Sequence, residues 1–213
     1  MGYIIACDFD GTVTATDTIV AIIKHFANDA GTPIINNILS QKISIQQGVT
    51  ELFRLLPSDK KNEVIQFVLE SVDLRPGFQR LLNEAQRLSI PFYIISGGMH
   101  FFIDPILEKF DGIHEVFANE VDFSSDTMEV KWIHPCDADC TGNCGTCKPS
   151  IVRQLVKDQK VIAIGDSVTD LKLLELADIA FTTAKLTDFA RDKGISHHHF
   201  DTFNDIKLSE VIQ

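Results

Sequence analysis

Two aspartates, Asp8 and Asp10, follow directly after the short apolar run Ile4–Cys7 near the start of the chain. An apolar run of this length that ends at a glycine turn is typical of a strand buried in a parallel sheet. Side chains alternate along a strand, so the two carboxylates should point one way and Phe9 the other. Ligands bind at the carboxyl ends of strands in open α/β sheets, where paired carboxylates can act as nucleophile, acid, base or metal ligand. Standing alone, such a pair would more often cap a turn or a helix.

Three later segments carry polar groups of the same kind. Ser96 and Gly97 follow a second apolar run, and Lys148 opens a helical segment. Asp166 and Asp170 follow a third apolar run. Four carboxylates at one sheet edge would not all stay ionised without a cation, and oxygen ligands without histidine favour Mg²⁺. A hydroxyl, a glycine amide and an ammonium group are the donors that a phosphoryl group needs, so the set indicates phosphoryl transfer.

These residues, in this order, resemble the four motifs of the haloacid dehalogenase superfamily of phosphotransferases, and the resemblance spans nearly the whole chain. It implies that Asp8 is both a Mg²⁺ ligand and the nucleophile that forms an aspartyl-phosphate. It implies that Asp10 is the general acid and base and lends its backbone carbonyl to the metal. The remaining roles that it implies are phosphate binding by Ser96, Gly97 and Lys148 and metal binding by Asp166, with Asp170 supporting the metal through water.

An α/β core and a helical insert are the elements that must position these residues. Over residues 75–213 apolar strands alternate with helical patterns, which predicts a parallel sheet with right-handed crossovers. Residues 16–74 show helical periodicity throughout, with Pro33 expected to separate two helices and Ser58 to cap another. We therefore predict a Rossmann-like α/β core formed by residues 1–15 and 75–213. The helical cap, residues 16–74, is inserted after the first strand and lies over the active edge.

Composition limits the partners of the chain. The 213 residues, 45% of them hydrophobic, suffice for one domain with a small appendage. The formal net charge of −11 argues against a nucleic-acid partner. No apolar run approaches the ~18 to 20 residues of a membrane span, and no secretory leader pattern opens the chain, so we expect a cytoplasmic protein without a membrane partner. The expected partner is a small phosphorylated metabolite, since local donors and a metal decide its binding.

Four of the five cysteines, Cys136, Cys140, Cys144 and Cys147, lie in one short segment. The spacings are close to those of a structural Zn²⁺ site, and a cytosolic chain seldom uses such a cluster for stable disulfides. Zinc is one interpretation; reduced thiols or a disulfide are the others. A bound zinc would brace the segment that delivers Lys148, because four thiolates leave no open position for catalysis.

The substrate is indicated by less specific features. The position of the insert resembles the phosphoserine phosphatase branch, in which an acidic residue at the place of Asp17 lies near the substrate's amino group; a helix N-cap is the alternative. The segments Ile95–Phe102 and Cys147–Ser150 look more like the phosphatases of bacterial methionine salvage, which convert an enol sugar phosphate to an acireductone. His100 could reach the mouth of the pocket, although a lone histidine is more often a surface or core residue.

The sequence thus predicts a Mg²⁺-dependent phosphomonoesterase of that salvage step. Two alternative functions stay open, one of them enzymatic and the other not. The first is a phosphoserine, phosphoethanolamine or phosphocholine phosphatase. The second is a phosphate-binding regulatory module that kept the fold without the activity.

Overall fold

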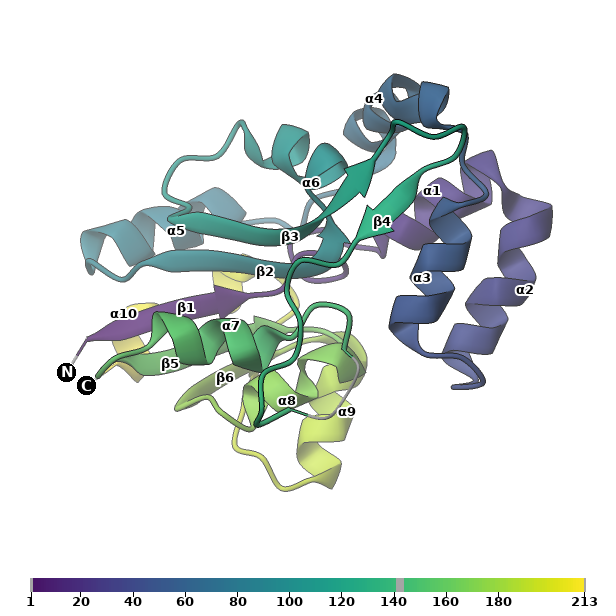
Figure 1. Cartoon of the computed structure of the whole chain (residues 1–213). Coiled ribbons are helices and arrows are strands. Elements are labelled where there is room, and N and C mark those ends of the chain that lie inside the picture. Colours follow the sequence, from purple (N-terminus) through teal and green to yellow (C-terminus); the bar gives the residue numbers. More distant parts are fainter. Residues whose placement is uncertain (1, 141–143, 213) are drawn as a thin grey trace.

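A twisted sheet forms the centre of the molecule, for which a computed structural model describes residues 2–140 and 144–212 (Figure 1). Within these residues the sheet has seven strands in the order β4-β3-β2-β1-β5-β6-β7, and neighbouring strands are parallel except for the antiparallel β3–β4 hairpin. The chain builds one side of the sheet from β1 to β4 and then crosses to the other side for β5 to β7. The sheet is therefore doubly wound, with its switch point beside β1, as the predicted α/β core requires. The strands are β1 (Tyr3–Cys7), β2 (Phe92–Met99), β3 (Glu115–Asp122), β4 (Glu129–Lys131), β5 (Lys160–Gly165), β6 (Ile179–Thr182) and β7 (His198–His199).

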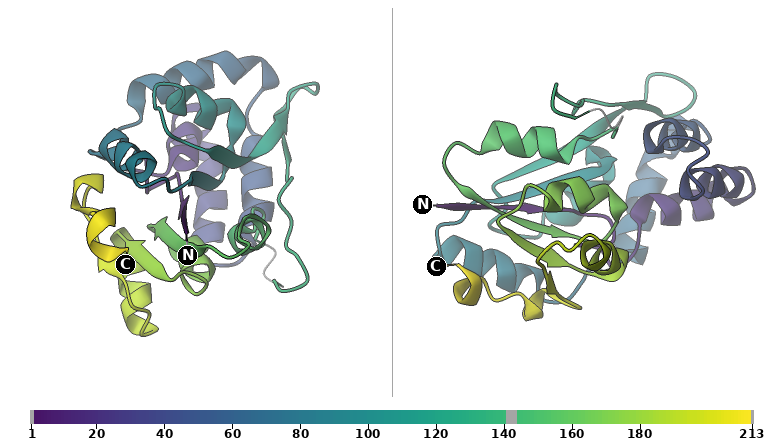
Figure 2. Two further views of the ribbon diagram at one scale, coloured as in Figure 1. Left: turned by 90° about the vertical axis from the view of Figure 1, so that its left-hand side faces the viewer. Right: turned by 90° about the horizontal axis from the view of Figure 1, so that it is seen from below.

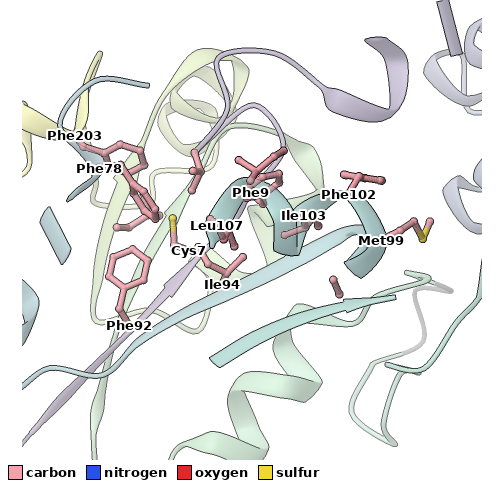
Figure 3. Close-up of a cluster of buried hydrophobic side chains, with 14 of the residues drawn as sticks. Cys7, Phe9, Phe78, Phe92, Ile94, Met99, Phe102, Ile103, Leu107 and Phe203 are labelled. Carbon is pink, nitrogen blue, oxygen red and sulfur yellow. The ribbon is translucent and has the colours of Figure 1, made fainter. Parts of the chain in front are cut away.

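Both faces of β1 are covered, which explains its unbroken apolar sequence. Ile4 and Ala6 pack with residues of α7, α8 and α9, whereas Ile5 and Cys7 belong to a larger cluster with α5 and α6. Part of this larger cluster, including Phe9, is drawn in Figure 3. None of the helices in the described part of the chain is long and apolar enough to cross a membrane. The core helices are α5 (Phe78–Arg87), α6 (His100–Leu107), α7 (Lys148–Leu155), α8 (Leu171–Leu174), α9 (Ala184–Asp192) and α10 (Leu208–Val211).

Of the α-helices that lie between β1 and β2 in the chain, the first four sit at the end of the sheet toward which these two strands point (Figures 1 and 2). Where the chain leaves the core and returns to it, Ala15 N donates to Asp73 O and Arg75 N donates to Val13 O, each at 2.8 Å. These bonds pair the two linkers at the predicted boundary; the division into two domains stays a prediction. The helices are α1 (Thr18–Phe26), α2 (Asn28–Leu39), α3 (Ile45–Phe53) and α4 (Lys61–Ser71).

Two local expectations about the insert are wrong. Pro33 lies inside α2, and the break between helices comes at Ala27, whose φ of −147° and ψ of 35° are not helical. Pro33 is exposed, so water can bond the carbonyl that a proline leaves without its helical partner. Ser58 does not cap a helix, because it is itself the first residue of a 3₁₀ turn and its backbone N–H donates to Asp126 O at 2.9 Å.

The β3–β4 hairpin connects the core to the insert; alternating stretches within residues 113–133, around a turn at 124–126, predict it from the sequence. Its tip pairs with the segment between α3 and α4, and just beyond β4 the indole N–H of Trp132 donates to Thr50 Oγ1 of α3 at 3.0 Å. An exposed ion pair joins Arg54 to Glu129 at 3.1 Å. The insert is therefore fastened at its two linkers and again at the hairpin.

Candidate active site

The loop after β1 places Asp8 and Asp10 at the carboxyl edge of the sheet. Gly11 makes the tight turn possible, because its φ of +83° lies in the left-handed region. A Cβ at this position would also lie 2.3 Å from Asp166 Oδ2, which follows β5. The glycine thus lets the loops after two neighbouring strands approach each other closely.

Lys148, the first residue of α7, is buried between two of the carboxylates. Its Nζ contacts Asp8 Oδ1 and lies 2.5 Å from Asp170 Oδ1. The other oxygen of Asp170 accepts the backbone N–H groups of Asp166 at 3.1 Å and Ser167 at 3.2 Å. Burial alone would lower the pKa of Lys148, but the charges of Asp170 and Asp8 outweigh this effect and raise it. Lys148 therefore stays an ammonium group, as a phosphate-binding role requires.

Asp10 faces the other side of the site, toward β2 and the insert. Its Oδ1 accepts the backbone N–H of Thr18 at 3.1 Å, and Ser96 Oγ donates to its Oδ2 at 3.4 Å. Ser96 Oγ in turn accepts the N–H of Gly98 at 2.9 Å. A Cβ on Gly97 would meet no atom within 4 Å, so the backbone beside Ser96 borders open space. Asp10 thus joins the start of α1 to the residues predicted to bind phosphate.

The acids of the site hold protons unusually firmly. Burial, followed by the charge of Asp170, raises the pKa of Asp8 to about 6. Burial, followed by the charge of Asp17, raises the pKa of Asp10 to about 7. The pKa of Asp166 is raised to about 8 by burial and then by the charges of Asp8 and Asp170. Such shifts indicate that negative charge is crowded here and that a cation would relieve it.

This arrangement fits a hard divalent cation. Carboxylate oxygens of Asp8, Asp166 and Asp170 lie within 4.8 Å of one another. Oxygen ligands of this kind, without histidine, suit Mg²⁺. Asp170 already accepts from Lys148 and from two backbone amides, so its free capacity is smaller than that of Asp8 or Asp166. That difference agrees with a supporting role for Asp170.

The residues singled out for other roles lie as follows. Asp17 Oδ1 accepts the N–H of Val20 at 2.9 Å, which confirms the N-cap interpretation, while its role near a substrate stays a prediction. His100 is half-buried at the start of α6, with Nδ1 3.0 Å from Asp104 Oδ1, and its role in specificity also stays a prediction. The structure also gathers the sulfur atoms of Cys136, Cys140, Cys144 and Cys147.

Asn119, a residue that sequence reasoning missed, connects two parts of the site. It is fully buried in β3, and its Nδ2 donates to Gly97 O at 3.2 Å and to Thr146 Oγ1 at 2.6 Å. Thr146 lies two residues before Lys148. The side-chain amide of Asn119 therefore bonds both the backbone of Gly97 in β2 and the segment that precedes Lys148. A polar residue directly after the largely apolar run 116–118 is the signal that could have identified it.

Arg75 and Thr12 also support the site. The guanidinium of Arg75 donates to Gly11 O at 2.7 Å and to Thr12 O at 2.9 Å, and so fixes the loop after β1. The hydroxyl of Thr12 lies 3.4 Å from Asp8 Oδ2 and 3.3 Å from Asp166 Oδ1. Neither residue is assigned a role from the sequence.

The site lies at the switch point of a doubly wound sheet. It combines carboxylates, a buried ammonium group and the glycines in the last part of β2. This combination defines the class of protein, an α/β enzyme that processes phosphoryl groups. A family model described as haloacid dehalogenase-like hydrolase matches residues 5–175. The chain therefore belongs to the haloacid dehalogenase-like hydrolase family, as a phosphoric monoester hydrolase.

Two curated relatives extend over nearly the whole chain. The 2-hydroxy-3-keto-5-methylthiopentenyl-1-phosphate phosphatase of Bacillus pumilus (strain SAFR-032) is 40% identical over 205 residues, 96% of this chain and 89% of the relative. The protein with the same name from Bacillus mycoides (strain KBAB4) is 42% identical over 206 residues, 96% of this chain and 94% of the relative. Among solved structures, phosphoserine phosphatase in its apo form matches with a TM-score of 0.73 and 18% identity, covering 100% of both chains. This last likeness confirms the predicted fold.

Proposed function

We propose that this chain is a Mg²⁺-dependent phosphomonoesterase whose substrate is 2-hydroxy-3-keto-5-methylthiopentenyl-1-phosphate. The observation that carries the chemistry is the buried contact of Lys148 with Asp8 and Asp170 beside Asp166. The substrate rests on the relatives of that name, which are 40% and 42% identical over 96% of the chain. Removal of phosphate from this enol ester gives the acireductone of methionine salvage.

In the first chemical step, a carboxylate oxygen of Asp8 attacks the phosphorus atom. An aspartyl-phosphate bond forms while the bond from phosphorus to the substrate oxygen breaks, and Asp10 gives its proton to that oxygen. In the second step Asp10 takes a proton from water, whose oxygen attacks the phosphorus and releases orthophosphate from Asp8. A pKa of about 7 lets Asp10 serve as acid and base near neutral pH.

The phosphoryl group would be held by the groups around Asp8 and Asp10. Ser96 offers a hydroxyl, Gly97 offers a backbone N–H next to open space, and Lys148 offers a fixed positive charge. A Mg²⁺ ion would be held by Asp8 and Asp166, with the backbone carbonyl of Asp10. When bound, this ion neutralises negative charge on the phosphoryl oxygens.

The insert, residues 16–74, would act as the cap that closes over the bound substrate. Its first helix begins at Thr18, whose backbone N–H donates to Asp10, so cap and acid–base residue are in direct contact. The non-phosphate part of the substrate would then lie near the start of α1 and of α6. Asp17 and His100 are the polar residues that we assign to substrate selection there.

The exchange Asp8→Asn tests the chemistry. We expect a loss of about 10³-fold or more in kcat with little change in the melting temperature, because the amide keeps the shape of the side chain but is a poor nucleophile. Asp158→Asn, an exposed exchange just before β5, is the matched control and should keep full activity. Turnover by the Asp8→Asn variant would remove the covalent mechanism.

A substrate panel with and without Mg²⁺ tests the specificity. The enol phosphate should have the highest kcat/KM, ahead of phosphoserine, phosphoethanolamine and phosphocholine. Preference for one of the other three would reassign the substrate and leave the chemistry intact. A protein that binds phosphate esters but cleaves none of them, p-nitrophenyl phosphate included, would be a regulatory module.

A further inference from the structure

The four clustered cysteines have the geometry of a metal site. Their Sγ atoms all lie within 4.8 Å of one another, and those of Cys140 and Cys144 are 3.8 Å apart. A tetrahedral zinc site with Zn–S bonds of about 2.3 Å separates its sulfur atoms by about 3.8 Å. A disulfide would require about 2.05 Å, so this pair matches shared coordination and not a covalent bond.

The backbone around the cluster is built to hold this arrangement. Gly145, between two of the cysteines, has a φ of +74°, and a Cβ there would lie 2.7 Å from the ring of Trp132. The first part of the segment is tied to α7, because Arg153 of that helix pairs with Asp137 at 2.5 Å and 2.8 Å. Cys147 closes the segment, and its N–H donates to His134 O at 2.9 Å. Cys136 therefore lies next to a residue that is paired with α7, and Cys147 is bonded to the backbone of His134.

One neighbouring charge suits a thiolate site. Lys172 of α8 donates from Nζ to Cys140 Sγ at 3.5 Å. A zinc ion with four thiolates carries excess negative charge, which a nearby ammonium group compensates. Lys172 lies two residues after Asp170, so this contact also joins the cluster to the turn that holds Asp170.

We propose that Cys136, Cys140, Cys144 and Cys147 bind one Zn²⁺ and that this ion positions Lys148. On binding, the four thiols release their protons to solvent and become thiolate ligands; no oxidation or reduction takes place. All four positions around the ion are then filled, so it cannot bind substrate. Cys147 is the N-cap residue of α7, and Lys148 is the next residue. Fixing the Cys147 sulfur therefore fixes the backbone from which the lysine reaches Asp8.

Metal content of the purified full-length chain tests the site directly. Native mass spectrometry should show one zinc per chain, and a protein reconstituted with Co²⁺ should show the strong visible bands of a tetrahedral thiolate site. Cys144→Ser should lose the zinc. Two controls should keep it: Cys7→Ser, which removes a cysteine in β1, and His198→Ser, which alters the exposed run of histidines where zinc could bind adventitiously. A wild-type protein that binds neither zinc nor cobalt at these thiols would overturn the proposal.

The positioning role rests on the proposed phosphatase activity and needs a second measurement. Removal of zinc, with Mg²⁺ restored afterwards, should lower kcat/KM for p-nitrophenyl phosphate about tenfold or more, since a small displacement of a catalytic group has effects of that size. In a Lys148→Ala background the same removal should change the residual activity less than about twofold, because the two changes act through one group. Equal losses in both backgrounds would contradict positioning through Lys148. Zinc bound to an enzyme inactive on every ester would refute the proposed function but not the site.

Discussion

Asp170 shows how the site depends on a carboxylate that need not touch the substrate. Both of its oxygens accept hydrogen bonds, one from Lys148 and the other from the backbone N–H groups of Asp166 and Ser167. A Cβ on Gly165 would lie 2.6 Å from its carboxyl carbon, so the strand end is shaped to admit it. Asp170 therefore contacts both Lys148, which is predicted to bind phosphate, and the backbone of Asp166, the predicted metal ligand.

Asn119 has a comparable role on the other side of Lys148, and its loss is our prediction at this scale. Asn119→Ala removes the donor from Gly97 O and from Thr146 Oγ1, and the second of these acceptors is buried. We expect destabilisation of about 1–3 kcal/mol and a fall of about tenfold in kcat/KM. Urea unfolding and steady-state kinetics measure the two effects.

Asn83→Ala is the matched control for this exchange. Asn83 is exposed on α5, where its side chain accepts from Gln79 Nε2 at 2.8 Å. Its removal should change stability by less than about 0.5 kcal/mol. If the two variants behaved alike, Asn119 would have no special part in holding the site.

Sequence position explains which site residues could be predicted. Asp8, Ser96 and Asp166 each lie at the end of an apolar run, so their common edge follows from the rule for parallel sheets. Asn119 and Arg75 bond backbone carbonyls that lie 22 and 64 positions away in the chain. These hydrogen bonds depend on the final packing of the loops, and no local sequence pattern predicts which carbonyl each side chain will bond.

At the scale of elements, Trp132 links the insert to the residues that precede Lys148. Trp132 donates to Thr50 of α3 on one side and packs against Gly145 on the other. Because Gly145 lies three residues before Lys148, the same ring that holds α3 also limits the path of the segment that delivers the lysine. The insert and the segment that precedes Lys148 thus share one supporting side chain.

Gly145→Ala tests this shared support. The new methyl group would meet the ring of Trp132 and would sit in a left-handed backbone conformation, so we expect a loss of about 1–3 kcal/mol in the free energy of unfolding. Gly194→Ala is a matched control, since Gly194 has a similar φ of +69° but open space around it. Trp132 is the one tryptophan in the sequence, so its fluorescence reports the local change.

The comparison of the two variants separates strain from contact. Gly194→Ala should lose only the backbone contribution, about 1–2 kcal/mol, and should keep the wild-type emission. Gly145→Ala should lose more and should shift the emission of Trp132. If both variants lost the same free energy of unfolding and the emission of Trp132 did not change, the Trp132 ring would accommodate the new methyl group without disturbing its neighbours.

Elements with a strong pattern were predictable and the short ones were not. Apolar sequence predicts buried strands over residues 91–95 and 160–164, and alternation around its turn predicts the hairpin. The strand β7 consists of two exposed histidines, and its pairing with β6 has no counterpart in the sequence pattern. β2 also continues beyond Ile95 to Met99, because it pairs there with Asn119 of β3.

At the scale of the whole molecule, negative charge opposes folding when no cation is bound. The chain carries a formal charge of −11, and the pKa values of Asp8, Asp10 and Asp166 are raised to about 6, 7 and 8. The folded chain therefore binds more protons at these groups than the unfolded chain does. The stability that these three carboxyl groups contribute by binding protons is fully present below their pKa in the unfolded chain, near 4. It is lost as the pH rises through their pKa values in the folded chain.

This sign predicts how Mg²⁺ and pH act together. Without Mg²⁺, the melting temperature should fall between about pH 5 and pH 8.5, and each 1 kcal/mol lost should lower it by about 2–4 °C. Saturating Mg²⁺ should raise it, and more at pH 8.5 than at pH 5, because protons compete with the ion for the same carboxylates. Scanning calorimetry of wild type and Asp166→Asn tests this, since the variant loses one raised carboxylate and should show a smaller slope and a smaller Mg²⁺ effect. Asp158→Asn makes the same change of net charge at an exposed position and should follow wild type. If both variants changed alike, repulsion across the whole surface, and not the crowding at this site, would set the response.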